Sequence, residues 1–159
     1  MIQEYQVSGF RVREYEELES TNTEAERVGW SELEDKMVIL TYRQTQGRGQ
    51  VGNHWESEPG KNISMTVVFK PRELPAGQQF AVSMVIALGA CDFISRYVSG
   101  CSVKWPNDIY VGDRKISGIL IEHSIMGRYV GGSLCGIGVN INQERFLSDA
   151  PNPVSLFQL

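Results

Sequence analysis

Alternating hydrophobic and polar positions predict several β-strands in the first half of the chain. Over residues 62–70 most alternate side chains are large and apolar, and a period of two is typical of a strand with one buried face. Residues 37–42 form an apolar, partly β-branched run, which predicts a buried strand. A further strand is predicted over residues 10–18.

Two segments carry helical signals instead. Thr21 and Glu24 are spaced as in a capping box, and they open a predicted helix that ends near Trp30. Residues 78–98 contain no proline and are apolar nearly all round, as expected of a helix that packs under a sheet.

The second half of the chain has the pattern of short strands joined by tight turns. Pro106 stops the first strand, and turns at residues 112–113 and 126–128 predict two hairpins. The predicted strands are residues 103–105, 109–111, 115–116, 118–125 and 129–141. Because most neighbours are antiparallel, the expected class is α+β, a mixed, largely antiparallel sheet with helices packed on it. One domain is expected over residues 1–159.

Composition and charge narrow the function classes. Of the 159 residues, 42% are hydrophobic and 21% are charged, which is an ordinary balance for a globular domain. The net charge of -4 and the pI near 5.2 argue against a phosphate-backbone footprint, because that requires a basic face. Nucleic acid is not an expected partner.

Export, membrane and metal signals are weak in this sequence. The three cysteines are widely spaced, which fits neither a disulfide framework nor a paired-cysteine metal clip. The first residues lack the basic start and apolar centre of a secretion signal. Residues 80–94, the longest apolar stretch, are interrupted by Ser83 and Asp92 and are too short to cross a bilayer. We expect a cytoplasmic protein with no membrane partner.

Gly47, Gly49 and Gly52 form a G-x-G-x-x-G pattern directly after the predicted strand at residues 37–42. A dinucleotide site requires a helix immediately after such a loop, but a strand is predicted next. The H-R-D and D-F-G motifs of protein kinases and the phosphate-binding P-loop motif do not occur. Two interpretations remain: an anion-binding nest of backbone N–H groups supplemented by Arg48, or a flexible turn with a solvated arginine.

A second candidate site lies in residues 104–108, Lys-Trp-Pro-Asn-Asp, and in the hairpin that follows. Activation of a carboxylate by ATP brings two anions together, so the site needs cations that reduce their repulsion. Lys115 could supply such a charge, and Asp108 could orient Lys115 or act on an incoming amine. The alternative is that Lys115 is an ordinary surface lysine and Asp108 an ordinary turn aspartate.

These features belong to a set of six segments in a fixed order. The segments are Ser20-Thr21-Asn22, Gln44-Thr45-Gln46-Gly47-Arg48-Gly49, Trp55-x-Ser57, Lys104-Trp105-Pro106-Asn107-Asp108, Lys115-x-x-Gly118-Ile119-Leu120 and Gly136-Ile137-Gly138-Val139-Asn140. In this order they resemble the motifs of biotin protein ligases, and the resemblance covers residues 15–142. It implies the catalytic-domain fold of biotin and lipoate protein ligases, which is similar to that of class II aminoacyl-tRNA synthetases.

The resemblance implies a two-step reaction without a covalent enzyme intermediate. Biotin, the substrate, and ATP with Mg²⁺ give biotinyl-5'-AMP, and a lysine of a biotin carboxyl carrier protein or another acceptor domain then takes the biotinyl group. The metal would enter with ATP rather than bind in a cage of protein ligands alone. The resemblance also allows a homodimer.

The same resemblance assigns roles residue by residue. The catalytic residues would be Lys115, Arg48 and Asp108. The biotin-binding residues would be Ser20, Thr21, Asn22, Gln44, Arg48, Gly49, Gln50, Trp55, Lys115, Gly118 and Ile119. The ATP-binding residues would be Arg48, Trp55, Asn62, Lys104, Asn107, Lys115 and Asn140. Capping by Ser20 and Thr21, and plain packing by Trp55 and Ile119, are the structural alternatives.

The sequence departs from the family pattern in length and in one loop residue. Gln50 stands where many relatives carry a second arginine, which predicts weaker retention of the adenylate. Relatives continue into further helices and a small C-terminal barrel-like domain, so residues 1–159 are expected to be a catalytic domain truncated near a helix start. Too few residues precede Ser20 for the DNA-binding module of dual-function relatives.

Two other functions stay open. A lipoate protein ligase would run the same chemistry on a related fold, although the glycine loop and the full 104–108 motif favour biotin. The chain could also be a non-catalytic module that binds the cofactor or the acceptor without turnover.

Overall fold

The computed structural model describes residues 2–50, 52–148 and 150–159. Its strands are β1 (Ile2–Val7), β2 (Phe10–Tyr15), β3 (Met37–Thr41), β4 (Gly47–Arg48), β5 (His54–Trp55), β6 (Ile63–Phe69), β7 (Cys101–Lys104), β8 (Asp108–Val111), β9 (Arg114–Met126) and β10 (Tyr129–Val139). Its helices are α1 (Thr21–Val28) and α2 (Phe80–Ser95), with two short 3-10 turns, η1 (Ala76–Gln78) and η2 (Leu156–Gln158).

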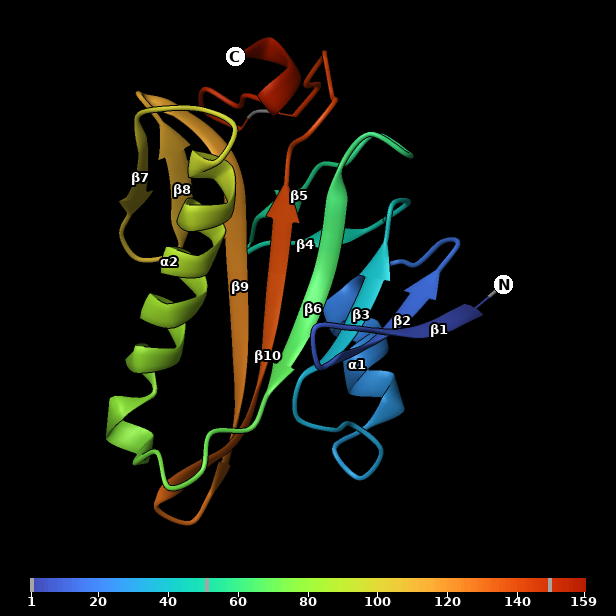
Figure 1. Ribbon diagram of the computed structural model, residues 1–159, viewed down its shortest axis with the longest axis vertical. Coiled ribbons are helices and arrows are strands. Elements are labelled where there is room, and N and C mark those ends of the chain that lie inside the picture. The colour runs from blue at the N-terminus through green and yellow to red at the C-terminus, as the bar shows by residue number, and fades with distance from the viewer. Residues whose placement is uncertain (1, 51, 149) are drawn as a thin grey trace.

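Eight strands form one sheet in the order β1-β2-β3-β6-β10-β9-β8-β7, while β4 and β5 pair separately (Figure 1). Neighbouring strands of the described chain are antiparallel except β2 and β3, which run parallel. Helix α1 lies between β2 and β3 in the chain, as a parallel connection requires. The expected α+β class with a largely antiparallel sheet is confirmed.

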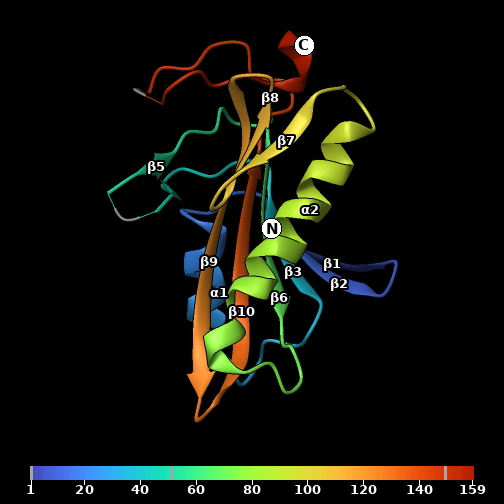
Figure 2. The ribbon, with the colours of Figure 1, turned by 90° about the vertical axis from the view of Figure 1, so that its left-hand side faces the viewer.

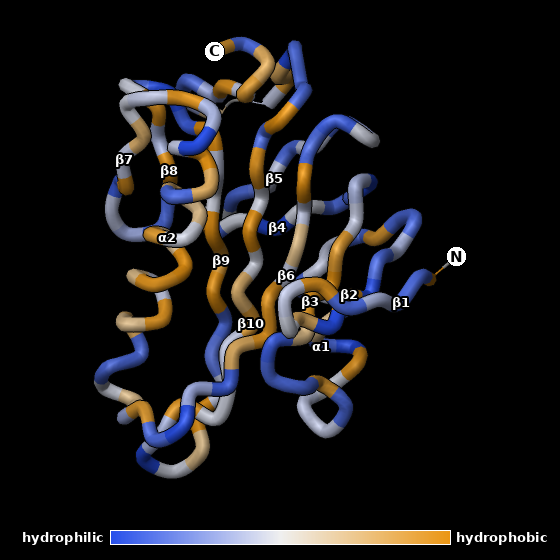
Figure 3. The backbone as a smooth tube through the Cα atoms, viewed as in Figure 1, coloured by the Kyte–Doolittle hydropathy of each residue, from blue (hydrophilic) through white to orange (hydrophobic). Residues whose placement is uncertain are grey.

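Alternation along the central strands gives the sheet two different faces. Ile63, Met65 and Val67 of β6 join a hydrophobic cluster with Ile137 of β10 and Ile94 of α2, so this face packs against α2. The opposite face carries small or polar residues at the same level, namely Ser64, Thr66, Gly136 and Gly138. Helices α1 and α2 therefore lie on opposite sides of the sheet (Figure 2), and hydropathy alternates along the central strands (Figure 3).

Helix α1 begins one residue earlier than the predicted capping box implies. The Ser20 side chain, in extended backbone, accepts the N–H of Thr23, whereas Thr21 is already helical. The predicted cap at Thr21 is therefore wrong by one position. Gly29, with a φ of 83°, ends the helix, because a left-handed φ is strained for residues with a Cβ.

Strand β1 was not predicted, and its exposure explains why. All six of its residues are exposed, so no hydrophobic alternation marks it, and it is held by its ladder to β2. The predicted strands at residues 115–116 and 118–125 are parts of one long strand, β9. Strands β3 and β6 confirm the predictions over residues 37–42 and 62–70.

Helix α2 is shorter than predicted, and only one of its faces is buried. Ile94 is fully buried, but Phe80, Met84, Val85 and Leu88 are 43–60% exposed. Including η1, the segment Ala76–Ser95 is long and apolar enough to cross a bilayer by length and composition alone, contrary to the expectation from residues 80–94. Core helices of soluble proteins pass the same test, and here α2 packs along β7, β8 and β9.

The three cysteines are free thiols. Cys91 of α2 donates to Cys101 of β7 across 3.0 Å, so two residues that the sequence separates are neighbours at the helix–sheet contact. Burial raises the pKa of Cys101 to about 11 and that of Cys135 to about 12. Neither of these two thiols is therefore a ready nucleophile at neutral pH.

Replacement of Ile94 by alanine tests the packing of α2. Because Ile94 is fully buried in the cluster against the sheet, Ile94→Ala should lower the free energy of unfolding by about 2–5 kcal/mol. The matched control is Leu88→Ala in the same helix, which should change it by less than about 1 kcal/mol because Leu88 is 59% exposed. Urea titrations followed by circular dichroism give both values, and equal losses would contradict this orientation of α2.

Candidate active site

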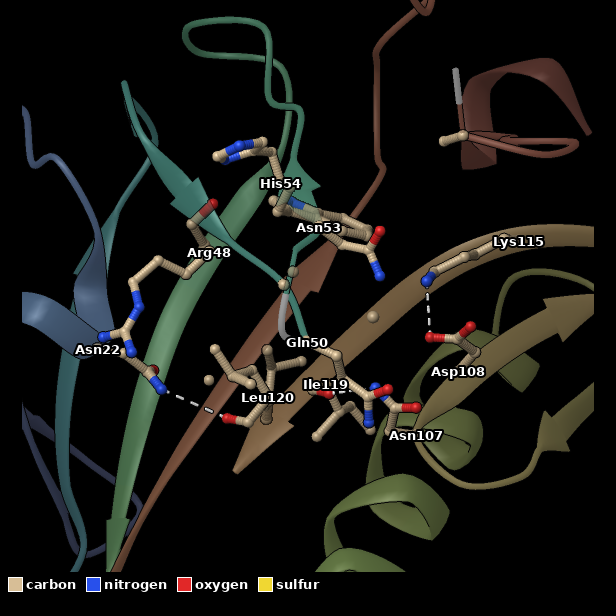
Figure 4. A pocket seen from close by; sticks show the side chains of 18 of the residues that line it. Asn22, Arg48, Gln50, Asn53, His54, Asn107, Asp108, Lys115, Ile119 and Leu120 are labelled. Atoms are coloured by element: carbon tan, nitrogen blue, oxygen red, sulfur yellow. Dashed lines mark hydrogen bonds and ion pairs between the residues drawn. The ribbon is translucent and has the colours of Figure 1, made fainter. Parts of the chain in front are cut away.

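A cavity of about 790 Å³ opens on the face of the sheet opposite α2. Residues from the start of α1, the β4–β5 hairpin, β6, β8, β9 and β10 line it, together with residues 148, 150 and 151. Figure 4 shows side chains reaching toward it from several of these elements. Segments from both halves of the chain therefore meet at one place.

Three glycines in the floor of the cavity leave room for larger side chains to lie directly on the sheet. A Cβ at Gly118 would come within 2.9 Å of the Trp55 ring, and one at Gly138 would overlap the indole. A Cβ at Gly136 would overlap the amide of Asn22. Gly136 and Gly138 thus permit close packing of the cavity residues Asn22 and Trp55.

The glycine-rich loop belongs to a hairpin, and two of its described N–H groups are bonded within the loop. Gly47 pairs with Trp55 in the β4–β5 ladder. The N–H of Gly49 donates to the carbonyl of Asn53 (3.0 Å), and the N–H of Asn53 donates to that of Gln50 (2.8 Å). Because the Gly49 N–H is used within the loop, the predicted anion nest is wrong for Gly49. A Cβ at Gly47 would overlap the Trp55 carbonyl, which accounts for glycine there.

Arg48 is paired with two carboxylates. Its Nη2 donates to Oε1 of Glu122 (2.5 Å), and its Nη1 donates to Oε1 of Glu26 (3.2 Å) and to Oγ1 of Thr23 (3.5 Å). Burial alone would lower the pKa of Arg48, but hydrogen bonds and charge from Glu26 and Glu122 raise it above its ordinary value. An incoming anion must therefore compete with these carboxylates for the guanidinium.

Lys115 faces Arg48 across the cavity (Figure 4). Its Nζ lies 2.6 Å from Oδ1 of Asp108 and 5.9 Å from the centroid of the Trp55 ring. The side chains of Lys115 and Asp108 are 25% and 22% exposed, so the pair is only partly solvated. The two candidate sites, the glycine-rich loop and the hairpin with Lys115, therefore meet at one cavity.

Buried polar groups form the wall at the start of α1. Ser20, Thr21, Asn22 and Gln44 each expose 9% or less of their surface. Oε1 of Gln44 accepts the N–H of Thr21 (3.0 Å), which leaves the Nε2 group of Gln44 as a donor. Ser20 caps the helix and also lines the cavity, so the capping and binding interpretations are compatible.

The segment at residues 104–108 forms the side of the cavity next to Lys115. Nζ of Lys104 donates to the hydroxyl of Tyr110 (3.1 Å) and lies 4.6 Å from its ring centroid. Nδ2 of Asn107 donates to the carbonyl of Ile119 (2.7 Å), and the N–H of Ile119 donates to that of Asn107 (3.0 Å). Asn107 therefore ties this segment to β9.

Glu56 fastens the C-terminal segment beside the cavity. Its carboxylate accepts the N–H groups of Leu147 (2.9 Å) and Ser148 (2.8 Å) and Nε2 of Gln143 (2.9 Å). Burial would raise the pKa of Glu56, but these hydrogen bonds lower it below its ordinary value. This carboxylate brings Ser148 to the lining, a contact that no local sequence signal marks.

Asn62 and Asn140, both predicted to bind ATP, do not line the cavity. Asn62 donates to Oε1 of Gln143 (2.5 Å) and accepts the N–H of Ile141 (3.0 Å). Nδ2 of Asn140 donates to the carbonyl of Val154 (3.1 Å). Both amides support the segment that follows β10, and Oδ1 of Asn140 is buried without a hydrogen-bond partner; their predicted contact with ATP stays a prediction.

The other predicted site residues all line the cavity. They are Ser20, Thr21, Asn22, Gln44, Arg48, Gly49, Gln50, Trp55, Lys104, Asn107, Asp108, Lys115, Gly118 and Ile119. The lining residues outside that prediction are Gly52, Asn53, His54, Ser64, Tyr110, Leu120, Gly136, Ile137, Gly138, Ser148, Ala150 and Pro151. Within the described ranges, the Trp55 Nε1 and Ser64 Oγ atoms are buried without a hydrogen-bond partner, and buried polar atoms usually have one.

The described residues contain no group of three His, Cys, Asp or Glu side chains that could hold a metal ion. The cavity itself offers the Asp108 carboxylate, which is already paired with Lys115. A divalent cation in this cavity would therefore depend on oxygen atoms of a bound ligand.

The chain matches the biotin/lipoate A/B protein ligase family over residues 15–140, which is most of its length. The chain is 26% identical over 140 residues to the bifunctional ligase/repressor BirA of Bacillus subtilis, covering 87% of this chain and 43% of that protein. It is 33% identical over 125 residues to the biotin–acetyl-CoA-carboxylase ligase of Paracoccus denitrificans, covering 77% and 51%. The chain thus spans about half or less of these relatives.

A similar solved structure is the biotin protein ligase from Aquifex aeolicus in complex with biotin and ATP. It superposes with a TM-score of 0.74 at 25% identity, covering 92% of this chain and 59% of that chain. The match includes the mixed, largely antiparallel sheet with its two helices. On the extent of the family match and this shared architecture, the chain belongs to the biotin/lipoate A/B protein ligase family.

Proposed function

We propose that this chain carries the active site of a cytoplasmic biotin protein ligase. The enzyme would convert biotin and ATP to biotinyl-5'-AMP and transfer the biotinyl group to a lysine of a biotin carboxyl carrier protein. The observation that carries the proposal is the meeting of residues from six separated motifs around one cavity with a polar end and a cationic end.

The polar wall supports biotin as the substrate. The ureido ring of biotin has one carbonyl acceptor and two N–H donors, and the wall offers both donors and acceptors from Thr21, Asn22 and Gln44. The dithiolane ring of lipoate has neither a carbonyl nor an N–H group. Lipoate would leave these buried polar groups unpaired, at a cost of about 1–3 kcal/mol for each. This difference favours biotin ligation over the lipoate alternative.

The first step joins two anions, and Lys115 is placed to reduce their repulsion. A carboxylate oxygen of biotin forms a bond to the α-phosphorus of ATP, and the bond to pyrophosphate breaks. The Lys115 ammonium lines the cavity and is held by Asp108 at 2.6 Å, so little reorganisation is needed when charge builds up nearby. Mg²⁺ would enter with ATP and neutralise phosphate charge.

Arg48 and Trp55 would enclose the reactants. Arg48 ties the β4–β5 hairpin to α1 and β9 through Glu26 and Glu122. Trp55 extends from that hairpin over the glycines of the floor. Excluding water in this way strengthens the interaction between Lys115 and the reacting groups and protects the mixed anhydride from hydrolysis.

The second step is aminolysis of the adenylate. The acceptor lysine, as a free amine, forms a bond to the biotinyl carbonyl carbon, and the bond to AMP breaks. Asp108 reaches the cavity beside Lys115 and is the proposed carboxylate that assists the incoming amine. The acceptor identity, a homodimer and the effect of Gln50 on adenylate retention stay predictions.

Incubation with biotin and MgATP tests the proposal. We expect pyrophosphate release that depends on biotin and, after addition of a biotin carboxyl carrier domain, covalent biotin on one lysine, detected by mass spectrometry. Lipoate in place of biotin is the matched control and should release little pyrophosphate. Preferential use of lipoate would contradict the substrate assignment. Well-folded protein that binds biotin but releases no pyrophosphate would instead support the non-catalytic module.

Replacement of Lys115 tests the charge argument. Lys115→Ala should lower the rate of biotin-dependent pyrophosphate release by about 100- to 1,000-fold, because a preorganised charge on the reacting groups is lost. The double variant Lys115→Ala with Asp108→Asn removes both members of the ion pair, so it leaves no unpaired carboxylate. It should unfold near the wild-type urea midpoint and remain slow. Pyrophosphate release at the wild-type rate in Lys115→Ala would remove the assigned role.

A further inference from the structure

Glu122 forms hydrogen bonds with two residues that line the cavity. It lies on β9 but does not line the cavity. Its Oε1 accepts Nη2 of Arg48 at 2.5 Å, and its Oε2 accepts Nδ2 of Asn22 at 2.8 Å. One carboxylate therefore holds a guanidinium of the glycine-rich hairpin and an amide of α1 at the same time.

The chemistry of that carboxylate fixes which way the Asn22 amide points. An ionised carboxylate can only accept hydrogen bonds, so the Asn22 group that faces Glu122 must be the donor, Nδ2. The same Nδ2 lies 3.4 Å from the carbonyl of Leu120 (Figure 4). Oδ1 of Asn22 is thereby turned toward the other side, where Oγ1 of Thr66 donates to it at 2.6 Å.

The order of hydrogen-bond donors and acceptors continues through two buried hydroxyl groups. Thr66 and Thr21 are 0% and 4% exposed, and their Oγ1 atoms lie 2.8 Å apart. A hydroxyl has one proton, and that of Thr66 is directed to Asn22, so Thr66 accepts the proton of Thr21. Thr21 and Asn22 both line the cavity, and with these protons committed their side-chain oxygen atoms can only accept further hydrogen bonds.

We propose that Glu122 is a positioning residue that sets the hydrogen-bond direction of this wall, and that the wall consequently selects a ligand ring with N–H donors. The proposal rests on the proposed function, because it explains how the chain would recognise the ureido N–H groups of biotin. The Nε2 donor of Gln44, fixed by the Thr21 N–H on its oxygen, is left for the ring carbonyl.

Glu122→Gln is the direct test. Glutamine has one acceptor and one donor group, and Arg48 can only donate, so the glutamine oxygen must face Arg48 and its amide NH₂ must face Asn22. Asn22 would then flip, and its NH₂ would meet the ring N–H of biotin. We expect the Kd for biotin, from isothermal titration calorimetry, to rise about 10- to 100-fold.

Glu26→Gln is the matched control. It removes the other carboxylate on Arg48, with the same change in charge, but the Glu26 carboxylate bonds to Arg48 and not to Asn22 or Thr66 among the described residues. We expect biotin affinity close to wild type in this variant. Equal weakening in Glu26→Gln and Glu122→Gln would show that the charge on Arg48, and not the direction of Asn22, controls binding, and would overturn the proposal.

A double variant in which the carboxylate and the amide exchange positions should restore biotin binding. In Asn22→Asp with Glu122→Gln, the new carboxylate can only accept, so it takes the glutamine NH₂ and the Thr66 proton and presents an acceptor to the cavity. Tighter biotin binding than in Glu122→Gln supports the proposal, and a folded double variant without that gain contradicts it. If Glu122→Gln alone fails to fold, a folded double variant that binds biotin with a Kd near the wild-type value supports the proposal, and one that binds far more weakly contradicts it.

The failure of the inference is distinguishable from that of the proposed function. Wild-type protein that binds no biotin would overturn both. Wild-type protein that binds biotin, with Glu122→Gln folded and equally tight, would overturn only the role of Glu122. Urea midpoints for each variant identify any loss of binding that comes from unfolding.

Discussion

Close packing on bare backbone is the constraint on which the site depends. At Gly118, Gly136 and Gly138 the sheet has no side chains, so Trp55 and Asn22 rest directly on β9 and β10. A single Cβ at Gly136 or Gly138 would displace one of them, since densely packed interiors yield little. The apolar opposite face packs against α2. A second hydrophobic cluster, which includes Ala25 of α1, Ile39 of β3 and Leu134 of β10, packs on the cavity side, so both faces of the sheet contribute to stability.

Two of the cations that line the cavity are held by carboxylates, whereas Lys104 contacts Tyr110. Arg48 is shared by Glu26 and Glu122, and Lys115 is paired with Asp108. Arg48 and Lys115 are thus preorganised, but an anionic ligand must exchange with carboxylates to reach either of them. Such exchange disfavours single anions that cannot also fill the polar end of the cavity, so it supports selectivity for a ligand with both a polar ring and a carboxylate.

Much of the fold could be predicted from local patterns, because β3, β6 and the hairpins bury one face or both. Strand β1 could not, since all its residues are exposed. The convergence of Arg48 and Lys115 came from resemblance to known ligases, as periodicity does not report long-range contacts. The hydrogen bonds of Asn62 and Asn140 to the C-terminal segment could not be predicted, because they join residues far apart in the sequence. Glu122 could have been found from the alternation of side chains along β9, because residues 118, 120 and 122 of a strand point to the same face.

A crystal structure with biotin and a non-hydrolysable ATP analogue tests the central claim, that one cavity holds both reactants between a directed polar wall and a paired lysine. The account predicts the ureido ring against Thr21, Asn22 and Gln44, with the biotin carboxylate and the α-phosphate both within hydrogen-bond distance of Nζ of Lys115. Ligands bound elsewhere, or a Lys115 that contacts only Asp108 while both anions lie beyond its reach, would contradict it.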